Sequence, residues 1–258
     1  QGRKYKLATM ADKLVCLLVF YRFALTDELL GWLVGLDAST VCRLQQRLEP
    51  LLEQAADPVL GLSLRRRLPP GAKKIGTVEE LLRVCPDFAE IMTDATEQPR
   101  RRLPRRTQRR WYSGKRKRHT IKTQITVNKA GRILLVSASV PGRVHDYTLF
   151  KREGTAERVP RGAQHDLDRG YDGAPTDYPE HHVIVPVKKR RNHRRLTRVE
   201  RGFNRLQARR RIIVEHVLCR MKKYQVLAQV YRHRLADYNR RFRNVAALVN
   251  FRLAAVTA

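Results

Sequence analysis

Positive charge is distributed very unevenly along this chain of 258 residues, and the asymmetry limits what the chain can fold into. Residues 1–93 hold 13 Lys or Arg and 11 Asp or Glu, whereas residues 94–258 hold 41 basic and 13 acidic side chains. The second part therefore carries +28 of the net charge of +30. A surface of one sign repels itself unless a polyanion binds it, and nucleic acid is the most common polyanion. A basic protein that is merely soluble is the alternative.

Composition excludes several other classes of protein. An apolar fraction of 42% is enough for a buried core, and no run of 18 apolar residues is present, so we expect no membrane partner. The N-terminus lacks a secretory signal pattern. The four cysteines are too far apart for a CxxC zinc site or a disulfide framework, so we expect a reducing compartment, the cytoplasm, with the nucleoid as the place of action in a bacterium.

The first sixty residues contain three segments with helical signals. Residues 7–24 place apolar side chains at helical spacing. Thr26 is an N-cap for a short helix that ends near Leu33, and Gly35 separates it from a third helix over about residues 40–54. This pattern is typical of a helix-turn-helix, although an ordinary helical hairpin has the same pattern. As a helix-turn-helix, it would present these side chains to DNA: Ser39, Thr40, Arg43, Gln46 and Arg47.

The rest of the chain predicts a sheet followed by helices. Residues 58–87 are expected to be a linker with a short helix after Thr77, because proline and glycine are frequent there. Apolar and alternating runs predict strands at 88–93, 120–127, 132–138, 163–167 and 183–187, with a hairpin turn at 128–131. Helices at about 196–224 and 237–256 close the chain. We therefore expect an α/β domain over residues 88–258 behind a helical domain over residues 1–57.

Two stretches are too basic to pack against themselves. Residues 100–118, within an insertion at 97–118, contain eleven Lys or Arg and no acid, and six of the eight residues 188–195 are basic. Such runs are expected to stay mobile or to lie on phosphates, with Trp111 and Tyr112 packing at the end of the first. A solvated loop is the alternative for that first stretch.

Three acids stand out against this basic background. Asp94 follows the apolar run 88–93 and Asp168 follows the run 163–167, so each is expected at the carboxyl end of a strand, where ligand sites of α/β sheets gather. Glu215 lies between apolar residues of a helix, where a carboxylate costs several kcal/mol unless a cation or hydrogen bonds meet it.

Two aspartates and a helical glutamate can together bind divalent metal. Their hard oxygen atoms suit Mg²⁺ or Mn²⁺. Two such ions would activate an attacking water or hydroxyl and stabilise the leaving oxygen of a phosphoryl transfer. Spacing alone explains Glu215 equally well by pairing with Arg211 or Arg220. The histidines show no spacing typical of zinc sites.

Five short motifs occur in order along the second part of the chain. They are TDAT at 93–96, YSGKRKRHT at 112–120, PGRVHD at 141–146, LDRGYDG at 167–173 and VEHVLCRMK at 214–222. In order and spacing they resemble the motifs of the DDE transposases of the IS5 group and of the related Harbinger-type elements, over residues 88–253. The resemblance implies an RNase H-like mixed-sheet catalytic core. For the N-terminal helices it implies the helix-turn-helix that precedes the nuclease in these enzymes.

The resemblance also implies roles for individual residues. Asp94, Asp168 and Glu215 match the acids of the family and are predicted to be its catalytic, metal-binding triad. Ala95 stands where the family usually has glycine, a small change beside a strand. The basic side chains of both stretches are predicted to hold phosphates rather than to read bases. They are Arg105, Arg106, Arg109, Arg110, Lys115, Arg116, Lys117, Arg118, His119, Lys188, Lys189, Arg190 and Arg191.

Three further motif residues are candidates for an accessory role. Asp146 is predicted to cap the helix that begins there, with His145 as a positioning donor, and an accessory role at the site is the alternative to this structural role for both. His216 follows Glu215 but points about 100° away around the helix, toward DNA or toward the core.

The function implied by the resemblance is that of a DNA transposase. The helical domain and the basic loops would bind the terminal repeats of the element, and the triad with Mg²⁺ would cut a phosphodiester and join the 3′-hydroxyl to target DNA. Pairing two ends of double-stranded DNA requires at least a dimer. A non-catalytic DNA-binding protein, such as a repressor or a domesticated transposase, would explain the charge but not the three acids. A nuclease with the same core would use the metals without joining ends.

Overall fold

The computed structural model describes residues 7–60, 77, 80, 82–83, 86–189 and 195–257. The chain forms two compact units that do not follow the order of the sequence. The helical unit contains the described parts of Gln1–Val59, Gln98–Arg101 and Arg220–Ala258, and the sheet unit contains those of Leu60–Glu97 and Arg102–Cys219. The C-terminal residues, which the sequence assigns to the catalytic domain, thus lie with the N-terminal helices.

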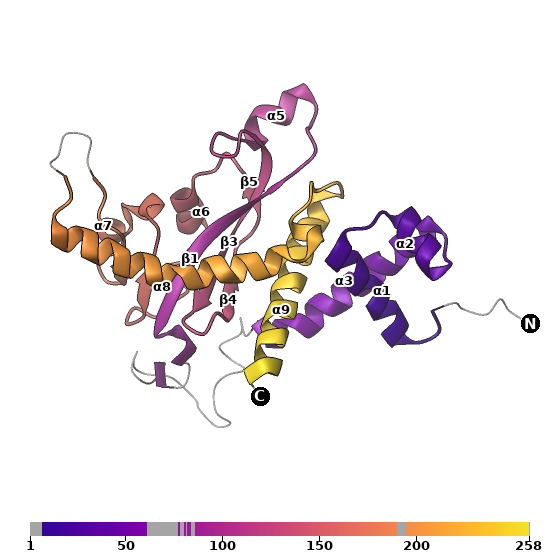
Figure 1. Cartoon of the computed structure of the whole chain (residues 1–258), viewed down its shortest axis with the longest axis horizontal. Coiled ribbons are helices and arrows are strands. Elements are labelled where there is room, and N and C mark those ends of the chain that lie inside the picture. Colours follow the sequence, from indigo (N-terminus) through magenta and orange to yellow (C-terminus); the bar gives the residue numbers. More distant parts are fainter. Residues whose placement is uncertain are drawn as a thin grey trace, which may run out of the picture. The chain divides into compact units, whose positions relative to one another are not determined.

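Three successive helices begin the helical unit, as predicted (Figure 1). Helix α1 (Met10–Phe23) starts with a capping box between Thr9 and Asp12, and it buries Cys16, Leu17, Phe20 and Tyr21. Helix α2 (Asp27–Val34) is capped by Thr26 and ends at Gly35, whose φ of +67° favours glycine. Helix α3 (Ala38–Leu60) follows after a short turn. The three helices are those expected, and contact with DNA remains a prediction.

The C-terminal segment completes the core of the helical unit. It consists of η4 (Gln225–Leu227), η5 (Leu235–Asp237) and α9 (Tyr238–Thr257). In Figure 1, α9 crosses α3, and Arg241 of α9 forms a buried ion pair of 2.6 Å with Glu49 of α3. Asn244 donates a hydrogen bond to the Tyr21 hydroxyl of α1, 3.0 Å away. The last helix therefore holds two N-terminal helices together.

A mixed sheet forms the sheet unit, and the predicted α/β fold is confirmed. Its described strands are β1 (Glu90–Pro99), β2 (Tyr112–Ser113), β3 (Arg118–Asn128), β4 (Ile133–Val136), β5 (Val140–Pro141), β6 (Gln164–Asp166) and β7 (His182–Ile184). Their order is β2-β3-β1-β6-β7, with β4 and β5 also paired to β3. Strand β6 runs parallel to β1 and β7, whereas β2, β4 and β5 are antiparallel to β3.

Helices and short turns accompany the sheet. They are η2 (Pro86–Phe88), α5 (Arg105–Trp111), α6 (Asp146–Arg152), η3 (Arg169–Tyr171), α7 (Ala174–Asp177) and α8 (Arg198–Lys222). Phe150 of α6 packs against Tyr171, Tyr178 and Leu167 in a buried cluster. A second cluster joins Phe88 and Ile91 to β4. No helix in the part of the chain that the structure describes combines the length and apolar character needed to cross a bilayer.

Two sequence expectations were wrong in this unit. Strand β1 continues to Pro99 rather than ending at Thr93, so Asp94 lies within the strand and not at its tip. The extension was hidden because its buried residues are polar, among them Thr96 and Gln98. The stretch 100–118 also contains a helix, α5, which ends at the buried Trp111. Arg and Gln are good helix formers, and this explains why a basic stretch can be helical.

Candidate active site

Two aspartates lie at matching positions of adjacent parallel strands. Met92 of β1 pairs with Asp166 of β6. Continuing this register by two residues places Asp94 opposite Asp168, which follows β6 with extended backbone angles (φ −80°, ψ 165°). Neighbouring strands are about 4.8 Å apart, so the two carboxylates start from adjacent points of the backbone. The sheet thus brings together two acids that are 74 positions apart in the sequence.

The environment of Asp94 disfavours its negative charge. Burial is the main reason that the pKa of Asp94 is raised to about 6, and the charges of Asp168 and Asp146 act in the same direction. The backbone N–H of Ala95, which donates to Asp94 Oδ1 at 2.8 Å, and the Arg211 guanidinium oppose the shift. The negative charges of Asp168 and Asp146 are therefore close enough to Asp94 to repel its charge, in a protein that is otherwise strongly basic.

Helix α8 lies against the same strands through two successive arginines. Arg210 approaches Glu90 of β1 at 3.7 Å and Asp166 of β6 at 3.8 Å. Arg211 Nη1 lies 2.8 Å from Asp168 Oδ1. The sequence offered Arg211 as a partner for Glu215, but the structure pairs it with Asp168. No local pattern indicates this pairing, because Arg211 and Asp168 are far apart in the sequence.

The sequence predicts Glu215 among apolar side chains, but in the structure its side chain is exposed. Val214, Val217 and Leu218 of α8 are buried, whereas Glu215 and His216 are exposed. The apolar residues that flank Glu215 in the sequence point to the core, and the helical period turns the carboxylate away from them. Glu215 therefore needs no buried cation.

Lys122 of β3 is a buried link between two acids, and sequence reasoning missed it. Its Nζ lies 2.6 Å from Asp146 Oδ1 and 3.6 Å from Glu97 Oε1, and it donates a hydrogen bond of 2.6 Å to the Val144 carbonyl. Glu97 also accepts from the Thr120 hydroxyl at 2.7 Å. A lone lysine inside the predicted strand 120–127 was the available signal. Lys122 fixes the loop before α6 to β1.

The helix cap expected at Asp146 is supplied by His145, and Asp146 has a different contact. His145 is the N-cap of α6, and its Nδ1 accepts from the backbone N–H of Tyr147 at 3.3 Å. Asp146 is the first helical residue, so its carboxylate is free to reach Lys122. The prediction that Asp146 caps the helix was therefore wrong, and its charge instead contributes to the surroundings of Asp94.

His165 lies under the aspartates on the opposite face of β6. Its Nε2 is 2.6 Å from the Thr93 hydroxyl, which in turn lies 2.7 Å from the Thr126 hydroxyl of β3. Phe150 packs on the ring at 5.5 Å. Burial lowers the pKa of His165 to about 3, so the imidazole is neutral. The chain of polar contacts through His165, Thr93 and Thr126 links β6, β1 and β3.

The donor set suits a hard divalent cation, although its third member is not in place. Asp94 and Asp168 offer carboxylate oxygens, which are ligands for Mg²⁺ or Mn²⁺. Among the residues that the structure describes, no three His, Cys, Asp or Glu side chains are arranged to hold a metal ion. The positive charge of Arg211 lies on Asp168 instead. The two aspartates thus fit one side of such a site, and assignment of the triad remains a prediction.

The predicted DNA-contacting residues of α3 share one face of the helix. Ser39, Arg43, Gln46 and Arg47 are exposed and Thr40 is partly so, whereas Val41, Gln45, Leu48 and Glu49 are buried on the other face. The Arg43 guanidinium turns back to the Ser39 carbonyl at 3.2 Å. The face is therefore open to a ligand, as a recognition helix requires.

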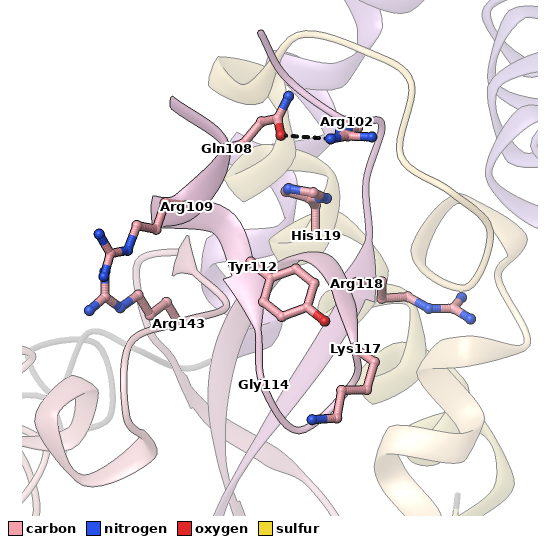
Figure 2. Close-up of a pocket in the computed structure, with 9 residues that line it drawn as sticks. All are labelled: Arg102, Gln108, Arg109, Tyr112, Gly114, Lys117, Arg118, His119 and Arg143. Atoms are coloured by element: carbon pink, nitrogen blue, oxygen red, sulfur yellow. Dashed lines mark hydrogen bonds between the residues drawn. The ribbon is translucent and has the colours of Figure 1, made fainter. Parts of the chain in front are cut away.

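Several of the predicted phosphate-binding residues line one hollow of about 960 Å³ in the sheet unit. Figure 2 shows the ring of Tyr112 in its middle, with Arg109 and Arg143 on one side and Lys117 and Arg118 on the other. Other predicted phosphate-binding residues do not line the hollow but are exposed: Arg110, Lys115, Arg116, Lys188 and Lys189. The side chains of Arg105 and Arg106, and all of Arg190 and Arg191, are outside the described parts of the structure.

Comparison with known proteins identifies the class to which this fold and these acids belong. The chain belongs to the DDE superfamily endonucleases, because the model of that family matches residues 93–250. Enzymes of this superfamily use divalent metal ions. The match spans both aspartates and α8, and it confirms the resemblance inferred from the motifs.

The comparison with curated proteins points in the same direction. The chain is 30% identical over 255 residues to a probable transposase for insertion sequence element IS702 from Microchaete diplosiphon. The alignment covers 98% of this chain and 84% of that relative. No solved structure matches the chain.

Proposed function

We propose that the protein is a DNA transposase that binds the terminal repeats of its element, cuts a phosphodiester there and joins the freed 3′-hydroxyl to target DNA. The observation that carries this proposal is the placement of Asp94 and Asp168 side by side on parallel strands, next to α8 with Glu215. The family and the transposase relative support it. The protein would act in the cytoplasm, on the nucleoid in a bacterial host.

The proposed metal ligands are Asp94, Asp168 and Glu215, with Mg²⁺ or Mn²⁺ bound as two ions. When bound, the ions would supply activation of the attacking oxygen and stabilisation of the leaving oxygen, so no side-chain nucleophile is needed. Arg211 contacts Asp168 through Oδ1, so its positive charge would compete with a cation at this carboxylate. Glu215 is an exposed residue of the same helix as Arg211.

Other side chains of the protein would hold DNA and keep the acids in position. Lys122 offsets one of the two negative charges of Asp146 and Glu97, which limits the negative charge that the DNA phosphates meet near Asp94. The basic residues of α5 and of the β2–β3 hairpin would bind the phosphate backbone, so binding should weaken steeply with salt. Helix α3 would contact the terminal repeat as part of a helix-turn-helix. Two ends require two active sites, and thus at least a homodimer on DNA.

The test is a strand-transfer assay with a labelled element end, a target plasmid and Mg²⁺. We expect joined product from the parent protein and none from Asp168→Asn, with DNA binding retained by the variant. Asp172→Asn is the matched control, because Asp172 is an exposed aspartate only four residues away, and its product yield should be unchanged. Binding without cleavage by the parent protein would favour a non-catalytic DNA-binding protein. Cleavage without joining would favour a nuclease.

A second variant separates catalysis from folding at Glu215. Glu215→Gln should abolish cleavage and bind DNA at least as well as the parent protein, because removal of a negative charge lessens repulsion of phosphate. Since the side chain is exposed, the free energy of unfolding should change by less than about 0.5 kcal/mol. A clear loss of DNA binding would assign Glu215 a folding role instead.

A further inference from the structure

The hollow around Tyr112 combines an exposed aromatic ring with unpaired positive charge. Tyr112 is 42% exposed, whereas the neighbouring Trp111 is buried. Five of the nine lining residues are Lys or Arg, and none is acidic. Within the described residues, no carboxylate pairs with Arg109, Lys117, Arg118 or Arg143. Such charges are available for an anion, and the ring is available for a flat apolar group.

The ring is held in place by the hairpin that carries it. Tyr112 of β2 and His119 of β3 are directly paired, and their rings meet edge to face with centroids 5.7 Å apart. The turn is closed by a hydrogen bond of 3.2 Å from the Arg116 N–H to Ser113 Oγ, and Lys117 has a left-handed backbone (φ +52°). A ring held this way loses little conformational entropy when a ligand stacks on it.

This combination is the one that single-stranded DNA requires. In a duplex the faces of the bases are covered by their neighbours, so a tyrosine ring has nothing to stack on. Proteins that bind single strands pair basic grooves, which follow the backbone, with aromatic side chains that stack on unpaired bases. Phosphate contacts alone would explain the cations but not the exposed tyrosine between them.

The hollow is close to the carboxylates within the same unit. His119 and Lys122 are three residues apart on β3, which is about 10 Å at the rise of a strand. Lys122 contacts Asp146, and Arg143 belongs to the loop that leads to Asp146. A strand bound in the hollow would therefore lie on the same part of the sheet unit as the acids.

We infer that this hollow binds an unpaired nucleotide of the DNA strand near the phosphodiester at the aspartates, with its base stacked on Tyr112. The inference rests on the proposed function, because it assumes that DNA is the substrate. Arg109 and Arg143 hold phosphates on one side of the ring, and Lys117 and Arg118 hold them on the other (Figure 2). Opening of the duplex near the cut is thereby stabilised.

The test measures DNA binding by fluorescence anisotropy without divalent metal, so that no cleavage occurs. The probes are a single strand, a fully paired duplex and the same duplex with four unpaired nucleotides. Tyr112→Ala should weaken binding of the two unpaired probes by about 5- to 150-fold and binding of the paired duplex by less than twofold. Tyr112→Phe keeps the ring and should bind like the parent protein. Phe203→Ala, which removes another exposed aromatic of the sheet unit, is the matched control.

A second measurement does not depend on the variants. A 2-aminopurine placed at each unpaired position in turn should lose fluorescence in the complex at one position near the cut, because stacking quenches it. Equal weakening of all three probes by Tyr112→Ala, no weakening at all, or no quenching at any position would overturn the inference. In each case, strand transfer by the parent protein would show that the proposed function still stands, whereas absence of both duplex binding and cleavage would reject the proposed function.

Discussion

Replacement of Lys122 by methionine should destabilise the sheet unit strongly. The lysine side chain is 7% exposed, and its partners Glu97 and Asp146 are 6% and 24% exposed. Methionine fills a similar volume but leaves both carboxylates without their cation and the Val144 carbonyl without its donor. Loss of one partner of a buried ion pair costs about 3–5 kcal/mol, because the remaining charge stays in a poorly solvated place.

The unfolding of the sheet unit can be followed by itself. Trp111 is buried in this unit, whereas Trp32 of the helical unit is 77% exposed and changes little on unfolding. Urea titration of tryptophan emission in a Trp32→Phe background therefore reports mainly on the sheet unit. We expect Lys122→Met to lower the free energy of unfolding by about 3–5 kcal/mol.

Two controls decide whether the buried charges are the cause. Lys129→Met removes an ion pair with Glu90 whose lysine is 71% exposed, and it should cost less than about 1 kcal/mol. Adding Asp146→Asn and Glu97→Gln to Lys122→Met should recover most of the loss, since the charges left behind are then removed. A loss below about 1 kcal/mol for Lys122→Met, or no recovery in the triple variant, would refute this account of the cluster.

Three further predictions concern protonation, the cation site and DNA binding. The pKa of His165 is about 3 in the folded protein and about 6.5 in the unfolded chain, so the free energy of unfolding falls as pH drops below 6.5. Between pH 7.5 and pH 5, urea titration should show a loss about 2 kcal/mol larger in the parent protein than in His165→Gln. Arg211→Gln frees Asp168 and should tighten Mn²⁺ binding about fivefold in calorimetry, or about 1 kcal/mol, and unchanged or weaker binding would contradict a cation site at Asp168. Arg47→Ala should weaken binding of the terminal repeat and lower the slope of log affinity against log salt by about 1, and an unchanged slope would mean that α3 does not contact phosphate.

The helical elements and most strands could be predicted from the sequence because their signals are local. Thr9 and Thr26 are both N-caps, and Gly35 ends α2 where the turn was expected. The strand at 120–127 was recognisable from its alternating apolar residues, and the strand at 163–167 from Ala163 and Leu167, which flank β6. The continuation of β1 through Thr96 and Gln98 was not, because both buried side chains are polar, and Gln98 is satisfied by hydrogen bonds to the Val226 and Gln229 carbonyls, which are distant in the sequence.

The candidate site was predictable only in part. Motif resemblance singled out Asp94 and Asp168, and their equivalence became visible once β1 and β6 were seen to pair in parallel. The partners of these acids were not predictable, since an ion pair between distant residues leaves no periodic trace in the sequence. Arg211 on Asp168 and Lys122 on Asp146 are both of this kind.

What the sequence by itself determined is the chemistry available to the protein: a large excess of positive charge, confined to residues 94–258, with a few acids whose surroundings in the sequence mark them out. Charge and local periodicity belong to the chain before it folds, so they could be read directly. Only the tertiary structure decided which acids meet, which cations neutralise them, and that Tyr112 stays exposed while Trp111 is buried. These outcomes depend on strand register and helix rotation, which are set by the packing of residues far apart in the chain.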